Sequence, residues 1–401
     1  MYKKVLGNTF LLLLPILLIV SFVNIKVDSA FLLKDFNKEI AKILVSGKNV
    51  EIKYLPNTNG DALEVDIVNE QLKLKKNSPV DILVFGSSRS AEINSHIFPN
   101  NTFFNCNKTG AKMLDYIAYY GLYKRNKLLP KYLIINFDFA TFHSSKLLNI
   151  DKRAFYVADT TKPLSIEGSL FNDYKIGLSY LSIEIDSNLN AVDQSILLSD
   201  NLIEFFNPSY YQLNLRYLNS KMLIATEKDY GDYTKGEFVI RSDGSYSSIL
   251  QSQIDSNWVK MFALKFIEIQ KSTLIIASDT SNIYFDYFKK LLIALKKDGV
   301  IPIVYISPIN PLVFDNICPD MHVALEDNID SFCKENLILR VGSFNPHKYG
   351  YHTAAKLWRD AYHPVSSVVS NIFNSHREQL KTIGINVEQS SMPKTPVEKA
   401  F

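Results

Sequence analysis

The sequence lacks the residue patterns of several common functional sites. Its 401 residues include only three cysteines, which form no CxxC pair and no Cys/His cluster at metal-ligand spacing, so a structural zinc site has no support. It also contains no Walker loop, no GxGxxG and no HExxH motif. We therefore predict a protein that uses no metal, nucleotide or redox cofactor.

Neither sign of charge is in large excess, and glycine and proline are scarce. The 44 Lys and Arg residues oppose 41 Asp and Glu residues, which leaves a formal net charge of +3. This balance argues against the basic surface of a nucleic-acid-binding protein. With 15 Gly, 15 Pro and 47% hydrophobic residues, the composition excludes a collagen-like or wholly disordered chain. The sequence predicts a globular protein without a nucleic-acid partner.

One long apolar run lies at the N-terminus. After two lysines, residues 5–23 carry no charge, and about 20 such residues are enough to cross a bilayer. The positive charge before the run favours a cytoplasmic N-terminus and an exported body. We predict a single-pass anchor over residues 1–24 in the inner or cytoplasmic membrane, with the body on the periplasmic or extracytoplasmic side. A cleaved signal peptide, with Ser29-Ala30 as the nearest pair of small residues, is the alternative.

Export would permit a disulfide bond. Cys318 and Cys333 could pair, which would leave Cys106 without a partner, or they could be two separate buried thiols. The sequence leaves both alternatives open.

Short apolar runs alternate with helical periodicity from residue 81 onward. Helical patterns cover 113–123 and 283–297, and a last helix is expected from Pro364. Strands that alternate with helices predict βα units around a parallel sheet, and therefore an α/β fold with three layers. The apolar runs are 82–85, 102–105, 132–136, 301–306 and 337–341.

The same alternation predicts the domain organisation. A helical linker or stalk at 25–80 precedes an α/β domain at 81–380. A Tyr/Asn/Ser-rich stretch at about 147–273 interrupts the alternation and is expected to be an insertion; its Asp243-Gly244 pair is typical of a turn. Residues 381–401, which end in SSMPKTPVEKAF, are expected to form a flexible tail.

Three predicted loops carry candidate site residues. The first strand ends in a small polar turn that contains Ser88, and ligands bind at this edge of open α/β sheets. The N–H groups of the following helix start can stabilise an oxyanion. Gly110 follows the second strand and lets a backbone N–H approach a substrate. Asp360 lies three residues before His363, so its carboxylate can orient the imidazole.

These elements, in this chain order, resemble the SGNH (GDSL-type) hydrolase superfamily, whose members have a flavodoxin-like three-layer fold. In that family a first block carries the nucleophile after a glycine, a second a glycine, a third an asparagine, and the last a DxxH pair. The resemblance implies that Ser88 is the nucleophile, that Asp360 and His363 are its acid–base pair, and that Gly110 is an oxyanion donor.

The third block departs from the family pattern. The family has Gly-x-Asn-Asp there, whereas this sequence has Ile135-Asn136-Phe137-Asp138, so Asn136 is an oxyanion donor only after a shift of one residue. Ser87 likewise occupies the place of the usual aspartate. The departure and the predicted anchor are similar to the envelope branch of the family, which includes D-alanine-transfer and alginate-acetylation proteins. Those proteins move acyl groups, usually beside a multi-spanning acyltransferase.

The resemblance implies a membrane-anchored serine esterase or O-acyltransferase that acts on acyl esters of a cell-envelope glycan. The sequence does not choose between hydrolysis and transfer, which depend on whether the site excludes water. The alternative is a non-catalytic binding or assembly protein with the same fold. The implied partners are the glycan or acyl ester, membrane lipid through the N-terminal helix, and a multi-spanning acyltransferase.

Two other features have structural explanations. Arg89 is expected to pair with Glu92 on a helix surface, rather than to bind an anionic substrate. His347 and His352 are expected to be surface-loop histidines; the alternative places them beside the candidate site.

Overall fold

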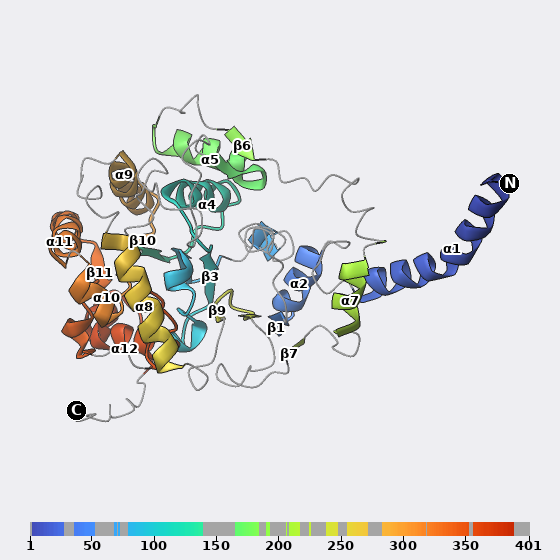
Figure 1. Cartoon of the computed structure of the whole chain (residues 1–401). Helices are drawn as coiled ribbons and strands as arrows, with labels where there is room; N and C mark the ends of the chain where they lie inside the picture. Colours follow the sequence, from blue (N-terminus) through green and yellow to red (C-terminus); the bar gives the residue numbers. More distant parts are fainter. Residues whose placement is uncertain are drawn as a thin grey trace. The chain divides into compact units, whose positions relative to one another are not determined.

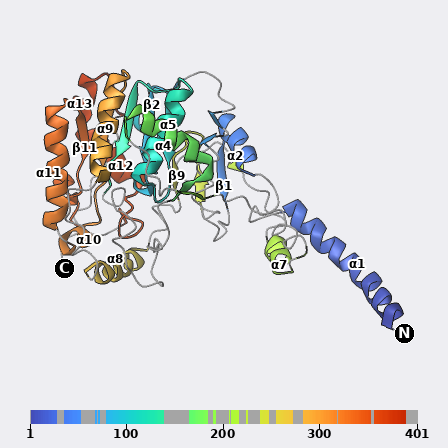
Figure 2. The same cartoon turned by 90° about the horizontal axis from the view of Figure 1, so that it is seen from above.

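A computed structural model of the chain forms two compact units (Figures 1 and 2). Unit 1 comprises Met1–Leu74 and Asp193–Ser242, and unit 2 comprises Lys75–Val192 and Asp243–Phe401. The predicted insertion at 147–273 is therefore divided between the two units. The residues that the structure describes are 2–27, 36–52, 68–69, 71–72, 79–138, 165–183, 190–192, 206, 208–216, 224–225, 238–247, 255–271, 283–317, 319–352 and 356–388.

Unit 1 contains the N-terminal helix and a small antiparallel sheet. Strand β1 pairs with both β7 and β8. No helix among the described residues is both long enough and apolar enough to span a membrane. The membrane anchor over residues 1–24 stays a prediction. The elements of unit 1 are α1 (Tyr2–Val27), α2 (Phe36–Val45), β1 (Asn49–Ile52), α7 (Pro208–Arg216), β7 (Ile224–Ala225) and β8 (Phe238–Ile240).

Unit 2 is built on a sheet whose five described strands are all parallel, in the order β11-β10-β4-β2-β3. In chain order this is 2-1-3-4-5, the order of flavodoxin-like sheets. Each apolar run predicted as a strand coincides with one of these strands. The runs are continuously apolar because strands of a parallel sheet are buried on both faces. The strands are β2 (Ile82–Gly86), β3 (Phe103–Asn107), β4 (Tyr132–Asn136), β10 (Ile301–Ile306) and β11 (Leu339–Gly342).

Helices cover both faces of this sheet, which makes three layers (Figure 1). On one face the Phe85 ring lies 5.5 Å from Tyr119 and 5.8 Å from Tyr123 of α4. On the other face the Tyr305 ring stacks on Phe373 of α12 at 5.4 Å. The helices of these layers are α4 (Met113–Arg125), α9 (Ile283–Lys297), α11 (Pro319–Glu335), α12 (Ser366–Ser375) and α13 (Arg377–Thr382).

The remaining elements of unit 2 are two further helices, α5 and α8, and short strands and helical turns around the sheet. They are η1 (Ser88–Ser90), η2 (Ser95–Ile97), β5 (Ser165–Glu167), α5 (Gly168–Tyr180), β6 (Asn190–Val192), β9 (Tyr246–Ser247), α8 (Ser256–Lys271), α10 (Pro311–Asn316) and η7 (Pro346–Tyr349). The predicted turn at Asp243-Gly244 is confirmed: Gly244 has a φ of +80°, and the Asp243 carboxylate accepts a hydrogen bond from the Ser245 amide at 3.0 Å.

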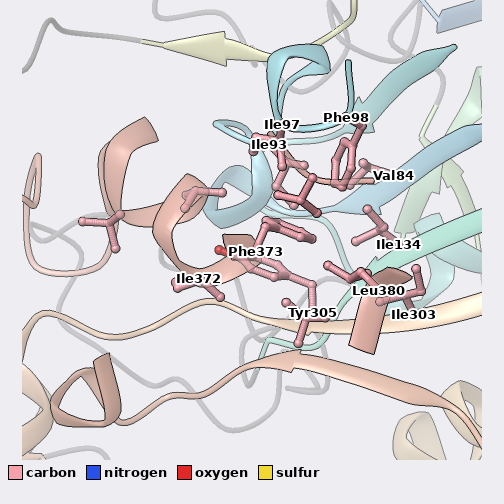
Figure 3. Packing of buried hydrophobic residues seen from close by; sticks show 14 of the residues in the cluster. Val84, Ile93, Ile97, Phe98, Ile134, Ile303, Tyr305, Ile372, Phe373 and Leu380 are labelled. Carbon is pink, nitrogen blue, oxygen red and sulfur yellow. The ribbon is translucent and has the colours of Figure 1, made fainter. Parts of the chain in front are cut away.

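The main apolar core lies between the sheet and the helices α12 and α13 (Figure 3). Val84, Ile134 and Ile303 come from three neighbouring strands and face Phe373 and Leu380 of these helices. Each of these five side chains is fully buried. Side chains alternate across a strand, so alternate residues enter this cluster: Ile82 and Val84 of β2, Tyr132 and Ile134 of β4, and Ile303 and Tyr305 of β10.

The C-terminal segment differs from the prediction of a flexible tail at 381–401. Ile385 is fully buried and Val387 is 5% exposed, and both belong to the main core. The Glu388 amide also donates a hydrogen bond to the Ile97 carbonyl at 3.1 Å. The tail prediction is therefore wrong for 381–388, because two apolar side chains between polar ones complete the core. Residues 389–401 lie outside the described part of the chain.

The cysteines do not support the disulfide alternative. Cys333 and Cys106 are both buried free thiols, and Cys318 lies outside the described residues. Cys333 is therefore a buried free thiol, as the alternative of separate thiols predicts.

Candidate active site

The candidate residues gather where the strand order of the sheet reverses. The chain leaves β2 toward β3 on one side and returns to β4 on the other, and ligands bind at such a switch point, beyond the carboxyl ends of the strands. Ser88 begins η1 directly after β2. A Cβ atom at Gly86 would lie 1.8 Å from Ser90 Oγ and 3.1 Å from the Asn136 Cβ, so this tight turn requires glycine.

The structure brings Ser88, His363 and Asp360 together in one chain of hydrogen bonds. The Ser88 Oγ lies 2.8 Å from His363 Nε2, although 275 residues separate the two in sequence. The other ring nitrogen, Nδ1, lies 2.6 Å from Asp360 Oδ2. All three side chains are partly exposed; that of His363 is 28% exposed and that of Asp360 24%. This geometry allows His363 to accept the Ser88 proton while Asp360 orients the ring.

The loop that carries Asp360 and His363 is closed by its own backbone. The Arg359 amide donates to the His363 carbonyl at 2.9 Å. Within this loop, Asp360 Oδ1 accepts from the amides of Tyr362 at 2.7 Å and His363 at 2.9 Å. From outside, Asn310 Nδ2 donates to the Asp360 carbonyl at 3.1 Å. One carboxylate oxygen therefore fixes the loop, and the other orients the imidazole.

The surroundings of Asp360 favour its ionised form. Burial by itself would raise the pKa of Asp360, but the His363 imidazole beside it and the hydrogen bonds from His363 and the Tyr362 amide outweigh burial. The net effect lowers the pKa below its ordinary value of 3.8. An ionised Asp360 can stabilise the imidazolium that forms when His363 takes a proton.

A buried polar network supports the turn from behind. Ser87 Oγ donates to Asp138 Oδ2 at 3.0 Å and accepts from Asn136 Nδ2 at 3.1 Å. The Arg89 guanidinium pairs with the other oxygen of Asp138 at 3.2 Å. These four side chains are at most 5% exposed. Ser87 is therefore held in the interior, while Ser88 faces His363.

The candidate oxyanion donors differ in their surroundings. Ser88 and Gly110 follow the neighbouring strands β2 and β3, and no acceptor within the described part of the chain is bonded to either backbone N–H. Gly110 is exposed, with a φ of +66°. Asn136 is fully buried. Its side-chain amide nitrogen donates a hydrogen bond to Ser87 rather than to Ser88. The oxyanion role of all three stays a prediction.

The predicted Arg89–Glu92 surface pair is wrong. Arg89 is only 4% exposed and pairs with Asp138. Glu92 is also buried and pairs with Arg359 at 3.4 Å. The reason is that η1 is only three residues long, so no helix surface exists on which the two side chains could meet. Sequence reasoning missed Arg359, whose only signal was its place beside Asp360.

His347 and His352 lie on the surface, as expected. Their rings stack with centroids 5.1 Å apart, and their Nδ1 atoms are 3.1 Å apart. His347 Nε2 also contacts Asp315 at 2.7 Å. Within the described residues, no group of three or more His, Cys, Asp or Glu side chains could hold a metal ion.

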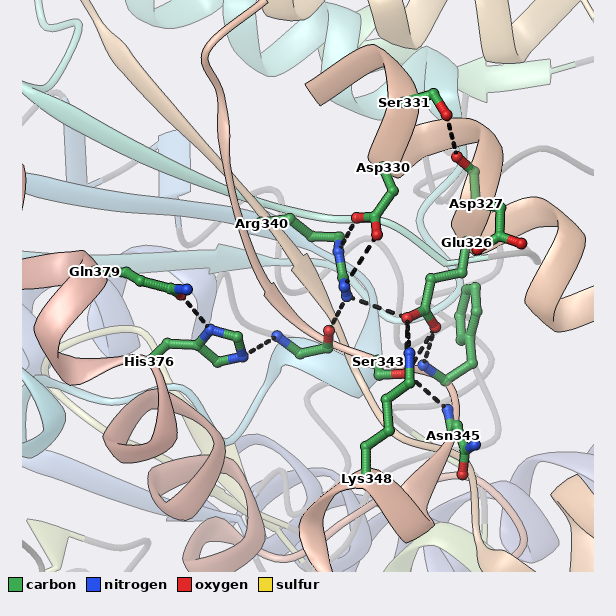
Figure 4. Close-up of polar contacts among 12 residues, drawn as sticks. Glu326, Asp327, Asp330, Ser331, Arg340, Ser343, Asn345, Lys348, His376 and Gln379 are labelled. Atoms are coloured by element: carbon green, nitrogen blue, oxygen red, sulfur yellow. Dashed lines mark hydrogen bonds and ion pairs between the residues drawn. The ribbon is translucent and has the colours of Figure 1, made fainter. Parts of the chain in front are cut away.

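The loop after β11 is anchored by a buried carboxylate on α11 (Figure 4). Glu326 accepts hydrogen bonds from Ser343 Oγ at 2.8 Å and 2.7 Å and from the Phe344 amide at 3.0 Å. Lys348 and Arg340 pair with the same carboxylate at 2.8 Å and 3.2 Å. These contacts fix Phe344, whose ring faces the Arg89 guanidinium at 5.8 Å.

A comparison of the chain with models of known protein families finds no match, and no curated protein matches it.

Proposed function

We propose that this protein is an extracytoplasmic serine esterase or O-acyltransferase of the SGNH type, which acts on acyl esters of a cell-envelope glycan. The observation that supports this proposal most is the contact of Ser88 Oγ with His363 Nε2 at 2.8 Å, backed by Asp360. The position of this contact at the switch point of a 2-1-3-4-5 parallel sheet adds support, because ligands of such sheets bind there.

The proposed reaction has two stages. His363 Nε2 takes the Ser88 proton as Ser88 Oγ attacks the ester carbonyl carbon. The bond from that carbon to the alkoxy oxygen then breaks, and the departing alcohol takes the proton from His363. In the second stage, water or a sugar hydroxyl gives its proton to His363 and attacks the acyl group on Ser88. The products are an acid or a new ester, and Ser88 regains its proton.

Two backbone amides are the proposed oxyanion donors. The N–H groups of Ser88 and Gly110 follow adjacent parallel strands and lack a bonded acceptor among the described residues. Each such donor contributes about 3 kcal/mol to transition-state stabilisation in comparable sites. The family's side-chain donor has no direct equivalent here, because Asn136 is buried against Ser87.

The envelope location rests on the N-terminal segment and on the family resemblance. Helix α1 exposes apolar side chains between Leu11 and Ile25; Leu12 is 75% exposed and Phe22 is 61% exposed. The proposed attachment to the inner or cytoplasmic membrane would place the active site near lipid-linked or glycan-linked acyl groups. A multi-spanning acyltransferase is the proposed partner in the transfer reaction.

Substitution of the nucleophile tests the proposal. We expect Ser88→Ala to lower the rate of aryl acetate hydrolysis at least ~10³-fold, because the acyl-enzyme can no longer form. Ser331→Ala is the matched control, since Ser331 is exposed on α11 and its hydroxyl donates to the Asp327 carbonyl. Labelling by a fluorophosphonate, read by mass spectrometry, should modify Ser88 and no other serine.

Two outcomes would contradict the proposal. Equal hydrolysis by the wild type and Ser88→Ala would remove Ser88 as the nucleophile. An absence of both hydrolysis and fluorophosphonate labelling in the wild type would instead favour a non-catalytic binding or assembly protein with this fold.

A further inference from the structure

We propose that Arg89 is a positioning residue that fixes Ser88 against His363 from inside the protein. The inference rests on the proposed function of Ser88 as the nucleophile. The placement of Arg89 is unusual, because arginine is rarely fully buried unless it is paired. Arg89 follows Ser88 directly in the chain, and yet its side chain is only 4% exposed.

The Arg89 guanidinium joins the ends of two further strands. Nη1 pairs with Asp138, two residues beyond β4, at 3.2 Å. Nη2 donates to the backbone carbonyls of Ser307 and Pro308, which follow β10; the latter distance is 3.1 Å. Because the planar guanidinium presents its donors in a rigid fork, these contacts determine where residue 89 lies relative to both strands.

The same guanidinium reaches the loop of the acid–base pair. Its carbon lies 5.8 Å from the centroid of the Tyr362 ring, within the range of a cation–π contact. Tyr362 is the residue before His363, as Arg89 is the residue after Ser88. The buried Arg89 side chain therefore connects the two chain segments whose side chains meet at the 2.8 Å contact.

A second buried pair joins the same two segments without Arg89. Glu92 and Arg359 lie 3.4 Å apart, and their side chains are 5% and 6% exposed. Because this pair remains when Arg89 is replaced, we expect the two segments to stay close together. The loss of Arg89 should then shift Ser88 relative to His363 without separating them, and misplacement of reacting groups by about 1 Å can cost ~10²-fold in rate.

Kinetics of Arg89→Ala test the inference. We expect kcat for aryl acetate hydrolysis to fall ~10²-fold while KM stays within about two-fold, because substrate binding is unchanged and the nucleophile is misplaced. Added guanidinium chloride at millimolar concentration should restore part of kcat by occupying the vacated position. The matched control is Arg125→Ala, which removes an arginine that pairs with the buried Asp173 at 2.9 Å on the helical layer. Its kcat should equal that of the wild type.

Labelling by a fluorophosphonate counts the active sites, so that kcat can be given per active site. The inference is overturned if this kcat is the same in Arg89→Ala and in the wild type, or if KM rises and kcat does not fall. Should Arg89→Ala fail to fold, Tyr362→Leu removes the ring that faces the guanidinium and must lower kcat in the same way. If Tyr362→Leu folds and its kcat equals that of the wild type, the inference is overturned.

Failure of the proposed function can be told apart from failure of this inference. If the wild type neither hydrolyses aryl acetates nor is labelled at Ser88, the proposed function fails. The positioning role of Arg89 is then tested by the low-field NMR resonance of the His363 Nδ1 proton. Loss or broadening of that resonance in Arg89→Ala, but not in Arg125→Ala, supports positioning by Arg89. An unchanged resonance in both variants overturns it.

Discussion

Ser87 and Ser88 are adjacent hydroxyls with opposite surroundings. Ser87 Oγ donates to Asp138 at 3.0 Å and is buried, whereas Ser88 Oγ is partly exposed and lies 2.8 Å from His363. A hydroxyl without a base is a weak nucleophile at neutral pH, so the contact with the imidazole makes Ser88 the candidate. Sequence alone chose Ser88 only through the family resemblance. The separation of the two roles comes from the direction in which the turn after Gly86 aims each side chain.

The pH dependence of stability tests the state of Asp360. Its folded-state pKa lies below 3.8, so the ionised carboxylate stabilises the fold above that pH and loses this contribution as the pH falls toward the folded-state pKa. We expect Asp360→Asn to lower the free energy of unfolding most above about pH 5, and the difference from the wild type to shrink toward about pH 2. Urea denaturation at a series of pH values measures this.

A matched carboxylate serves as the control for Asp360. Asp286 is 67% exposed on α9, so Asp286→Asn should change the free energy of unfolding little at any pH. A difference between Asp360→Asn and the wild type that grows as the pH falls would contradict the assignment.

The contact between α4 and α5 depends on two glycines. A Cβ atom at Gly121 would lie 2.2 Å from the Asp173 carbonyl oxygen, and one at Gly177 would lie 2.2 Å from the Ile117 carbonyl oxygen. Real side chains do not approach backbone that closely, so the two helix backbones can meet only where both residues lack a side chain. The sequence predicts a helix at 113–123, which the structure confirms as α4. It does not predict α5, where Gly177 resembles an ordinary break in a helical pattern.

Overpacking this contact should destabilise the protein. We expect Gly177→Ala to lower the free energy of unfolding by about 1–3 kcal/mol, because the helices must separate to admit a methyl group. Ser179→Ala, on the exposed side of the same helix, is the control and should stay within about 0.5 kcal/mol of the wild type. Urea denaturation measures both. A Gly177→Ala protein as stable as the control would show that α4 and α5 pack less closely.

At the scale of the whole molecule, the C-terminal segment closes the core of unit 2. Ile385 and Val387 extend the cluster that joins the sheet to α12 and α13, and the Tyr132 hydroxyl donates to the Ile383 carbonyl at 2.7 Å. Strands predicted from local patterns near the start of the domain thus depend on residues more than 250 positions later. Such dependence is hidden from local patterns: among residues 381–388 only Ile383, Ile385 and Val387 are apolar, and nothing in the nearby sequence shows what they pack against.

Truncation of a buried side chain tests this closure. We expect Ile385→Ala to lower the free energy of unfolding by about 2–5 kcal/mol, through lost burial and the cavity that remains. Leu337→Ala is the control, because Leu337 is 89% exposed, and its effect should be within about 0.5 kcal/mol. Thermal unfolding followed by circular dichroism compares the two. If Ile385→Ala unfolds at the same temperature as Leu337→Ala, residues 381–388 do not belong to the cooperative core.

The sequence by itself determined the α/β class, the five strands of the sheet and the loops that carry Ser88, Asp360 and His363. Apolar runs, helical periodicity and the DxxH spacing are local properties, and neighbouring residues are enough to reveal them. Only the tertiary structure decided which serine meets His363, that Arg89 turns inward to Asp138 rather than outward to Glu92, and that Ile385 is buried. These outcomes depend on contacts between segments that lie 49 to 275 residues apart. The energy of such contacts comes from packing and charge pairing across the fold, which no local pattern contains.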